Sequence, residues 1–307
     1  MSKFSDPRAK IADAPWGFMN GFTCKYPSAT RLAVVLLWLL GILTAYLSIR
    51  GAVVGTILGQ DAHAYWLAAQ SELVYDRAPG QRDAYLYSPA FVAAIKPLAT
   101  LSWPFFLVIW ICLEAAILIW LVKPLQLRWS APIFLLCLPE LMVGNIYILL
   151  AGSAVVGMYR PAAWGFPILT KLTAGVGLLW FAARGEWSRF IEGIGGLTLV
   201  VIVLYALEPT QWQAWMQFLF EQRDGTPDSQ TSFVLRCLLA ALLVAIGAWK
   251  QRPWLIAPAM VLASPVLVGL IPLTMLAAIP RLNRLARLDA NLSGPSLPRG
   301  RHMTKGF

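Results

Sequence analysis

Four long, mostly apolar runs constrain the fold of this chain more than any other feature. They cover residues 32–49, 104–122, 190–207 and 233–249. Each run meets or approaches the ~20 apolar residues that an α-helix needs to cross a bilayer. Of the whole chain, 58% is hydrophobic and only 13% is charged, against roughly a quarter charged in soluble proteins. A soluble enzyme is thereby excluded, and the sequence predicts an all-α, polytopic transmembrane helical bundle.

Three further apolar regions carry a polar or proline interruption near the middle, so each is either one long span or a hairpin of two short arms. These regions are residues 130–159, 161–183 and 253–280, interrupted at Gly144-Asn145, Thr170-Lys171 and Ser264-Pro265. Arms of about 14 residues rise only ~21 Å, which is less than the ~30 Å hydrocarbon core. With hairpins counted, the prediction is about eight to ten helices, short or re-entrant ones included.

The interruptions also predict where polar side chains meet. Non-helical backbone at membrane depth is tolerated only where it is buried in protein or lines a wet cavity. We therefore expect Asn145 and Lys171 to converge with Asp61 on one cavity that opens to the external side.

Basic residues set the predicted orientation. The chain holds 25 Lys and Arg against 15 Asp and Glu, and 11 of the basic residues lie in residues 1–31 and 281–307. Because Lys and Arg of short loops stay in the cytoplasm, both stretches are predicted to be cytoplasmic basic tails. Residues 32–280 then form one multi-pass domain of a cell-membrane protein. Nucleic acid is not a predicted partner, since no soluble stretch is long enough to read it.

The same rule divides the connecting segments between two sides. The near-neutral segment 51–102 and the acidic segment 208–232 are predicted to be external loops, so Asp61 and Asp224 face outside while Arg160 faces the cytoplasm. The second of these loops carries Trp212, Trp215 and Phe218. It either forms a helix at the membrane interface or anchors there as interfacial Trp commonly does.

Residues suited to chemistry gather in the first external segment. Asp61 follows the first span closely, where a partly desolvated carboxylate is suited to act as a general base. His63 lies two residues further on. Motifs of soluble enzymes are missing, since the chain has no Gly-rich phosphate loop, no G-x-S-x-G and no H-E-x-x-H. Its four cysteines give no disulfide framework or metal cluster.

Four motifs over residues 59–220 resemble, in order and spacing, those of the polytopic glycosyltransferases of family 87. They are D-x-x-x-Y-x-x-A-A from Asp61, Y-x-Y-S-P-A-F from Tyr85, G-N-I-Y-I-L-L-A from Gly144, and L-T-K ending at Lys171. Members of that family belong to the GT-C superfamily and move a sugar from a polyprenyl-phosphate donor to an external acceptor. The resemblance implies the same activity here, with a mannose-like sugar.

The resemblance also implies roles for individual residues. Asp61 matches the catalytic Asp of the first loop, Tyr87 and Pro89 match the Y-x-P element, Asn145 matches the amide position, and Lys171 matches the intramembrane Lys. Three departures stand against it. Leu172 replaces the proline after that Lys, Asn145 replaces a glutamine, and the usual Trp and His are missing after Ser264-Pro265.

The implied chemistry needs one base and one cation. Asp61 would take the proton of the acceptor hydroxyl, and Lys171 would hold the departing phosphate. The predicted substrate-binding residues are His63, Tyr65, Tyr85, Tyr87, Asn145 and Lys171, and no metal ligand is among the predicted site residues. The partners are the lipid bilayer, the lipid-linked sugar donor, and a glycolipid, glycan or protein acceptor. The sugar, any divalent-metal requirement and the oligomeric state stay open.

Structural alternatives stand beside each role. In these alternatives, Asp61 is a solvated loop carboxylate, Lys171 pairs with Glu114 or Glu140, and the tyrosines belong to an interfacial belt. His63, like Arg77 and Arg82, is otherwise an incidental loop residue. For the whole chain, short broken helices are also typical of a transporter or flippase, and the short chain and missing late motif also suit a non-catalytic descendant of the enzyme.

Overall fold

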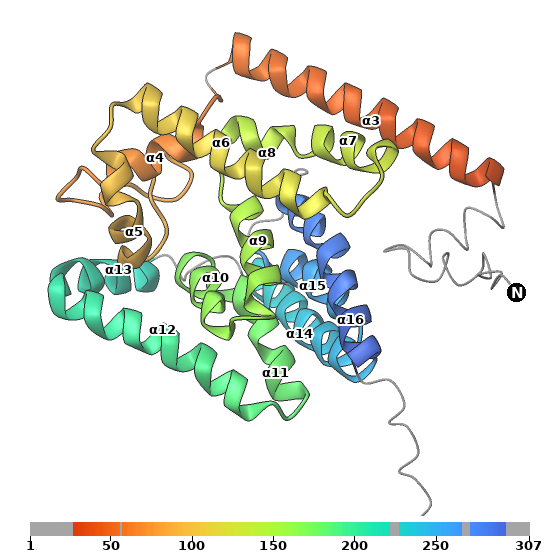
Figure 1. Cartoon of the computed structure of the whole chain (residues 1–307). Coiled ribbons are helices and arrows are strands. Elements are labelled where there is room, and N and C mark those ends of the chain that lie inside the picture. The colour runs from red at the N-terminus through yellow and green to blue at the C-terminus, as the bar shows by residue number, and fades with distance from the viewer. Residues whose placement is uncertain (1–26, 56, 222–226, 266–270, 293–307) are drawn as a thin grey trace, which may run out of the picture.

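The structure, a computed structural model, describes residues 27–55, 57–221, 227–265 and 271–292 (Figure 1). Over these residues the chain forms fourteen α-helices and four short 3-10 helices, with no strand. The predicted all-α class is confirmed. Asp224, predicted to be external, lies outside the described residues.

Four helices are long and apolar enough to cross a membrane, and they coincide with the four predicted runs. They are α3 (Pro27–Val54), α6 (Trp103–Val122), α12 (Trp187–Leu207) and α14 (Pro227–Trp249). Their large apolar side chains are extensively exposed, as with Leu39 on α3 at 60% and Ile202 on α12 at 62%. A bilayer covers such faces, so the membrane assignment accounts for their exposure.

The three interrupted regions are broken at the predicted places. The first forms α7 (Leu127–Leu136), α8 (Leu138–Val143) and α9 (Tyr147–Gly157). The second forms η1 (Pro161–Trp164), α10 (Gly165–Thr170), η2 (Leu172–Leu178) and α11 (Leu179–Ala183). The third forms η3 (Pro253–Leu255), α15 (Ile256–Ala263), η4 (Ile271–Ala278) and α16 (Ile279–Leu292). These short pieces raise the helix count above the predicted eight to ten.

The segments predicted to be external loops contain three helices. They contain α4 (Gln60–Ala68), α5 (Pro89–Ala99) and α13 (Pro209–Glu221). Figure 1 shows these three helices together at one end of the bundle, which we call the Asp61 end. The C-terminal end of α6 and helix α16 lie toward the opposite end, which we call the Lys123 end.

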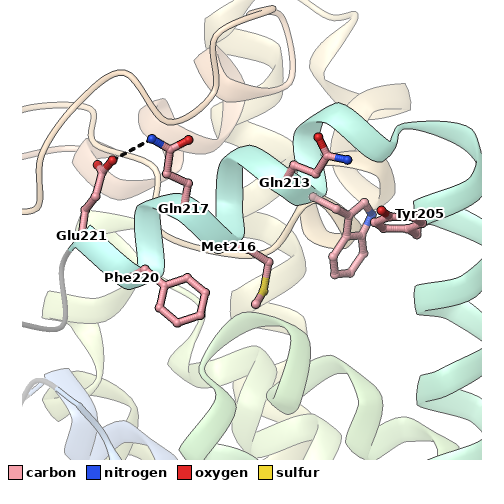
Figure 2. Close-up of a pocket in the computed structure, with 7 residues that line it drawn as sticks. Tyr205, Gln213, Met216, Gln217, Phe220 and Glu221 are labelled. Carbon is pink, nitrogen blue, oxygen red and sulfur yellow. Dashed lines mark hydrogen bonds between the residues drawn. The ribbon is translucent and has the colours of Figure 1, made fainter.

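Helix α13 has two chemically different faces. In Figure 2, Gln213, Gln217 and Glu221 lie along one side, while Met216 and Phe220 point to the other. Gln217 Nε2 donates to Glu221 Oε1 at 2.8 Å, and the Phe220 ring is 60% exposed. Trp212 and Phe218 are buried, and the Phe218 ring lies 5.6 Å from the Tyr75 ring. Of the two predicted forms of this segment, the structure has a helix, with the two faces that an interfacial helix needs.

Two glycines fix α4 against the first broken hairpin. Gly59 has φ +68° and its N–H donates to the Met142 carbonyl at 2.6 Å. Gly144, at φ +72°, approaches so closely that an added Cβ would lie 2.7 Å from the Ala62 Cβ. Both positions need a residue that adopts a positive φ without steric cost. The N-terminus of α4, which carries Asp61, is thereby held beside the break between α8 and α9.

Candidate functional site

Asp61, Asn145 and Lys171 form one chain of hydrogen bonds. The Asn145 amide nitrogen donates to Asp61 Oδ2, and the Lys171 ammonium donates to Asn145 Oδ1 at 3.2 Å. Asn145 Oδ1 also accepts the Ile146 N–H at 2.7 Å. The amide is therefore oriented with its NH₂ toward the carboxylate and its oxygen toward the ammonium. The three residues meet as predicted, while the external cavity and the roles of the residues stay predictions.

Each of the three residues lies where a helix begins or breaks. Asp61 is in the first turn of α4, Asn145 is in the break between α8 and α9, and Lys171 separates α10 from η2 with φ −131° and ψ 81°. A helix interruption leaves backbone groups without partners inside the helix. The Lys171 N–H still donates to Pro167 O at 2.8 Å, so the break is an ordered turn.

Two tyrosine rings surround the Lys171 ammonium. Nζ lies 3.4 Å from the centroid of the Tyr147 ring and 5.7 Å from that of Tyr87. A cation over an aromatic face is attracted by the ring quadrupole, and the attraction grows as water is excluded. Among the described residues, no carboxylate lies within 4 Å of the Lys171 ammonium group, and its hydrogen-bond acceptor is the neutral Asn145 amide.

Glu140 is a second carboxylate in this region. Its side chain is fully buried, and Oε1 accepts the Tyr147 N–H at 2.6 Å, at the start of α9. An acceptor there satisfies one of the free N–H groups of a helix N-terminus. Oε2 has no hydrogen-bond partner among the described residues. Glu140 therefore acts as a cap for α9, and no ion pair joins it to Lys171 among the described residues.

The surroundings of Asp61 favour its neutral form. Burial raises the pKa of this carboxyl group above its ordinary value, while the Asn145 hydrogen bond and the Lys171 charge act in the opposite direction. Burial dominates because it removes water from the charged form. A carboxylate with a raised pKa is a better proton acceptor than a solvated one.

The predicted tyrosines divide into two groups. The hydroxyl groups of Tyr65 and Tyr87 lie 3.3 Å apart beside the Asp61 cluster, and both rings are packed against Phe91. Tyr85 instead donates to the Ser88 carbonyl at 2.9 Å, within its own loop. The structure therefore brings Tyr65 and Tyr87 to the site and directs the Tyr85 hydroxyl group into the loop.

His63 is directed away from the three-residue chain. Its Nδ1 lies 2.8 Å from Asp83 Oδ1, and its ring lies beside those of Trp66 and Trp103. Arg77 also approaches Asp83, at 3.5 Å. His63 and Arg77 thus belong to a separate surface cluster centred on Asp83, a residue to which the sequence pattern assigned no role.

The third helix break reaches the same site through Tyr147. The Tyr147 hydroxyl group lies 2.9 Å from Ser264 Oγ, and the Arg236 guanidinium donates to Ser264 O at 2.8 Å. The Thr173 hydroxyl group donates to Ala263 O. Tyr147 is part of the motif that starts at Gly144, so its motif position was a signal. Ser264 was predicted only as a helix interruption, and no local signal identified Thr173. Their contacts join segments that are remote in sequence, so the sequence pattern did not predict them.

Several hollows surround the site. A mostly apolar groove of about 580 Å³ runs along α6 and α9, with Phe91, Trp110 and Phe166 at the part nearest Tyr87. Trp110 also donates to Gly144 O at 3.0 Å, next to Asn145. A hollow of about 720 Å³ beside α13 is lined by Tyr205, Met216 and Phe220 and lies away from these residues. The described residues contain no group of three or more His, Cys, Asp or Glu that could hold a metal ion.

One comparison with known proteins gave a match. The sequence model described as glycosyltransferase family 87 matches residues 85–295. The matched range contains Tyr85, Tyr87, Asn145 and Lys171, whereas Asp61, His63 and Tyr65 precede it. Neither the curated proteins nor the solved structures gave a match.

Proposed function

The chain belongs to glycosyltransferase family 87, and we propose that it moves a sugar from a polyprenyl-phosphate donor to an acceptor on the extracytoplasmic side of a cell membrane. Membership in the family and the apolar spans make it a membrane glycosyltransferase. The lipid-linked donor, the mannose-like sugar, the acceptor and the orientation belong to the proposal.

One observation carries the mechanism: a carboxylate and an ammonium group are joined through a single amide. Asp61 accepts from Asn145, and Asn145 accepts from Lys171. Transfer from a sugar phosphate needs a base for the incoming hydroxyl group and a cation for the departing phosphate. Asp61 and Lys171 supply these two groups at fixed positions relative to each other.

In the proposed step, the acceptor hydroxyl oxygen bonds to the anomeric carbon as the bond from that carbon to the phosphate oxygen breaks. The hydroxyl proton goes to Asp61, and the negative charge that develops on the phosphate is stabilised by Lys171. Attack opposite the leaving group inverts the anomeric centre. Asn145 orients both groups through its amide and is a positioning residue.

The surroundings of the site suit a donor with an apolar tail. The Tyr65 and Tyr87 rings are buried, 3% and 8% exposed, and pack against Phe91, where the groove of about 580 Å³ along α6 and α9 begins. This groove follows a membrane-crossing helix, so a prenyl chain lying in it stays within hydrocarbon. The acceptor, a glycolipid, glycan or protein segment, then approaches from the water-exposed side of Asp61.

The donor class is tested with the purified protein in proteoliposomes. We expect transfer of label from a polyprenyl-phosphate sugar to an added glycan or glycolipid acceptor, and no transfer from the corresponding nucleotide sugar. Transfer from the nucleotide sugar alone would overturn the lipid-linked donor.

Transport is a second candidate function, favoured by the three helix breaks. Discontinuous helices that meet at one polar point are typical of secondary transporters. Counterflow of a labelled lipid-linked sugar across liposomes, without transfer to an acceptor, would support this function. Absence of both transfer and counterflow in a folded protein would favour a non-catalytic descendant of the enzyme.

A further inference from the structure

We propose that the Lys123 end of the bundle holds an anionic phospholipid, with one acyl chain in an apolar slot and the phosphate against basic side chains. The slot is a hollow of about 420 Å³ between α3, α7, η4 and the start of α16. It lies apart from Asp61 and Lys171, and the proposal does not depend on the transfer reaction.

The slot has the chemistry of a hydrocarbon site. Its lining on α7 extends from Trp129 to Leu136, about 10 Å of helix at 1.5 Å per residue, and continues to Cys137 at the end of that helix. Thr274 supplies a hydroxyl group to the lining, and that group donates to Ile271 O at 2.7 Å. Its one hydroxyl group is already paired and most of its lining side chains are aliphatic, so the slot offers little to a polar ligand and suits an acyl chain.

The slot opens toward the surrounding lipid. Leu40 on α3 and Leu273 on η4 line it and remain 49% and 42% exposed. Leu40 neighbours other exposed apolar residues of the α3 face, Leu36 and Leu43, at helical spacing. An acyl chain of the bilayer therefore enters sideways, without crossing a polar barrier.

Basic side chains flank the slot where α6 ends and α7 begins. Lys123 and Arg128 are exposed and lie within two residues of the lining residues Leu125 and Trp129. Neither has a carboxylate within 4 Å among the described residues. Both remain available to an anion from outside the protein.

Two further arginines follow Pro280, another lining residue. Arg281 is fixed by its hydrogen bond to Trp120 O at 2.5 Å and by the Trp120 ring, 4.0 Å from its guanidinium carbon. Burial, and then the neighbouring Arg284 charge, lower the pKa of Arg281. Like charges held together attract an anion to this position.

The combination favours a phospholipid over a soluble anion. Free phosphate would use the basic groups and leave the slot empty, and a neutral lipid would use the slot and leave the charges unpaired. A lipid with a net negative headgroup satisfies both, as juxtamembrane basic clusters do with anionic lipids.

The experiment uses the full-length protein in vesicles of equal phosphatidylglycerol and phosphatidylcholine. After extraction, lipid that stays bound is counted by native mass spectrometry. We expect about one retained phosphatidylglycerol per chain and at least fivefold less phosphatidylcholine. Equal retention of the two lipids would overturn the proposal.

Two variants test the two parts of the site. Lys123→Gln combined with Arg128→Gln changes only exposed side chains and should reduce phosphatidylglycerol retention at least fivefold. Ala277→Leu fills the slot and should reduce retention to a similar extent. Lys96→Gln, an exposed cation at the Asp61 end, is the matched control and should retain lipid as the native protein does.

Size-exclusion chromatography shows whether Ala277→Leu folds. If it does not, the charge variant, Lys123→Gln combined with Arg128→Gln, still tests the proposal. Unchanged retention in the folded charge variant would overturn the headgroup contact. Unchanged retention in a folded Ala277→Leu protein would overturn the slot.

Discussion

The two ends of the bundle treat their charges differently. At the Asp61 end, Arg77 and Arg82 lie within 4 Å of Asp83, and Lys96 lies 3.5 Å from Glu208. At the Lys123 end, Arg184 and Arg189 contact Glu186, whereas a larger group has no carboxylate within 4 Å in the described part of the chain. That group comprises Lys123, Arg128, Arg160, Lys250, Arg252, Arg281 and Arg284.

The two ends therefore differ in whether their charged side chains are paired within the protein. Polar groups at the Asp61 end are fixed by contacts within the protein, as catalysis at a defined position needs. Most basic groups at the Lys123 end have no carboxylate within 4 Å among the described residues, and in the lipid proposal the membrane neutralises their charge. Substitutions at the first end should therefore change turnover, and substitutions at the second should change lipid contacts alone.

Replacing Asp61 by Asn should give the largest effect. The variant keeps the size of the side chain but removes proton acceptance, so turnover should fall by ~10² to 10⁴. The measurement is the rate of transfer from a lipid-linked sugar in proteoliposomes. Asp76→Asn, an exposed acid at the same end, should leave the rate unchanged. Turnover of Asp61→Asn within about threefold of the native rate would remove Asp61 as the base.

Replacing Lys171 by Met should give the next largest loss of activity. Unlike Asp61→Asn, it should change donor binding as well as turnover. The phosphate is charged both when the donor is bound and in the transition state, so KM should rise while kcat falls by ~10² to 10³. Steady-state kinetics over a range of donor concentrations separates the two effects. Lys96→Met provides a control at the same end. A changed KM with an unchanged kcat would mean that Lys171 binds the donor without stabilising the leaving phosphate.

Acid should inactivate the enzyme through Asp61. The base works only when it is deprotonated, and burial raises its pKa above the 3.8 of an ordinary Asp. Below that raised pKa, kcat/KM should fall about tenfold per pH unit and recover as the pH rises through it. A pH profile of kcat/KM provides the measurement. A profile that stays flat down to the ordinary pKa of an aspartate would show that the rate does not follow this group.

Replacing either of two glycines by alanine should lower stability, by different amounts. Gly144 and Gly185 have almost the same φ, +72° and +70°, but only Gly144 approaches a neighbour, the Ala62 Cβ. Gly185→Ala should cost ~1 to 2 kcal/mol of stability for the strained backbone alone. Gly144→Ala should cost more and also lower activity, because α4 must shift away from the break. Thermal unfolding in detergent, with activity assays, measures both effects, and equal losses in the two variants would contradict close packing at Gly144.

The smallest effect on activity is expected at the Lys123 end. Lys123→Gln combined with Arg128→Gln should leave turnover in neutral lipid within about twofold of the native rate, because both side chains are exposed and make no described ion pair. The transfer assay in phosphatidylcholine vesicles checks this. A loss of tenfold or more would erase the distinction between the two ends.

Much of the fold could be predicted because it depends on local patterns. The four spans and the three interruptions are properties of hydropathy and of single polar or proline residues, and the structure contains all of them. Predicting that Asn145 and Lys171 meet Asp61 needed one more step, the mismatch between short arms and a thick bilayer. That argument uses lengths and does not require knowledge of side-chain packing.

The remaining site contacts could not be predicted, because they depend on tertiary packing. His63 meets Asp83 across a loop, and Tyr147 lies beneath Lys171 while its hydroxyl group meets Ser264, 117 residues away. Glu140 could be recognised as a buried acid, yet its capping of Tyr147 depends on how the chain turns at Gly144. Periodicity determines which face of a helix is apolar but does not determine which breaks approach each other.

The long sequence separations within the hydrogen-bonded chain have a consequence for biosynthesis. Asn145 follows Asp61 by 84 residues, and Lys171 follows Asn145 by a further 26. At ~5 to 20 residues per second, the ribosome adds Lys171 roughly 5 to 20 s after Asp61. During this interval α4 lacks the hairpin against which Gly59 and Ala62 pack. A nascent chain arrested before residue 145 should therefore expose α4 to protease, and one released after residue 171 should begin to protect it.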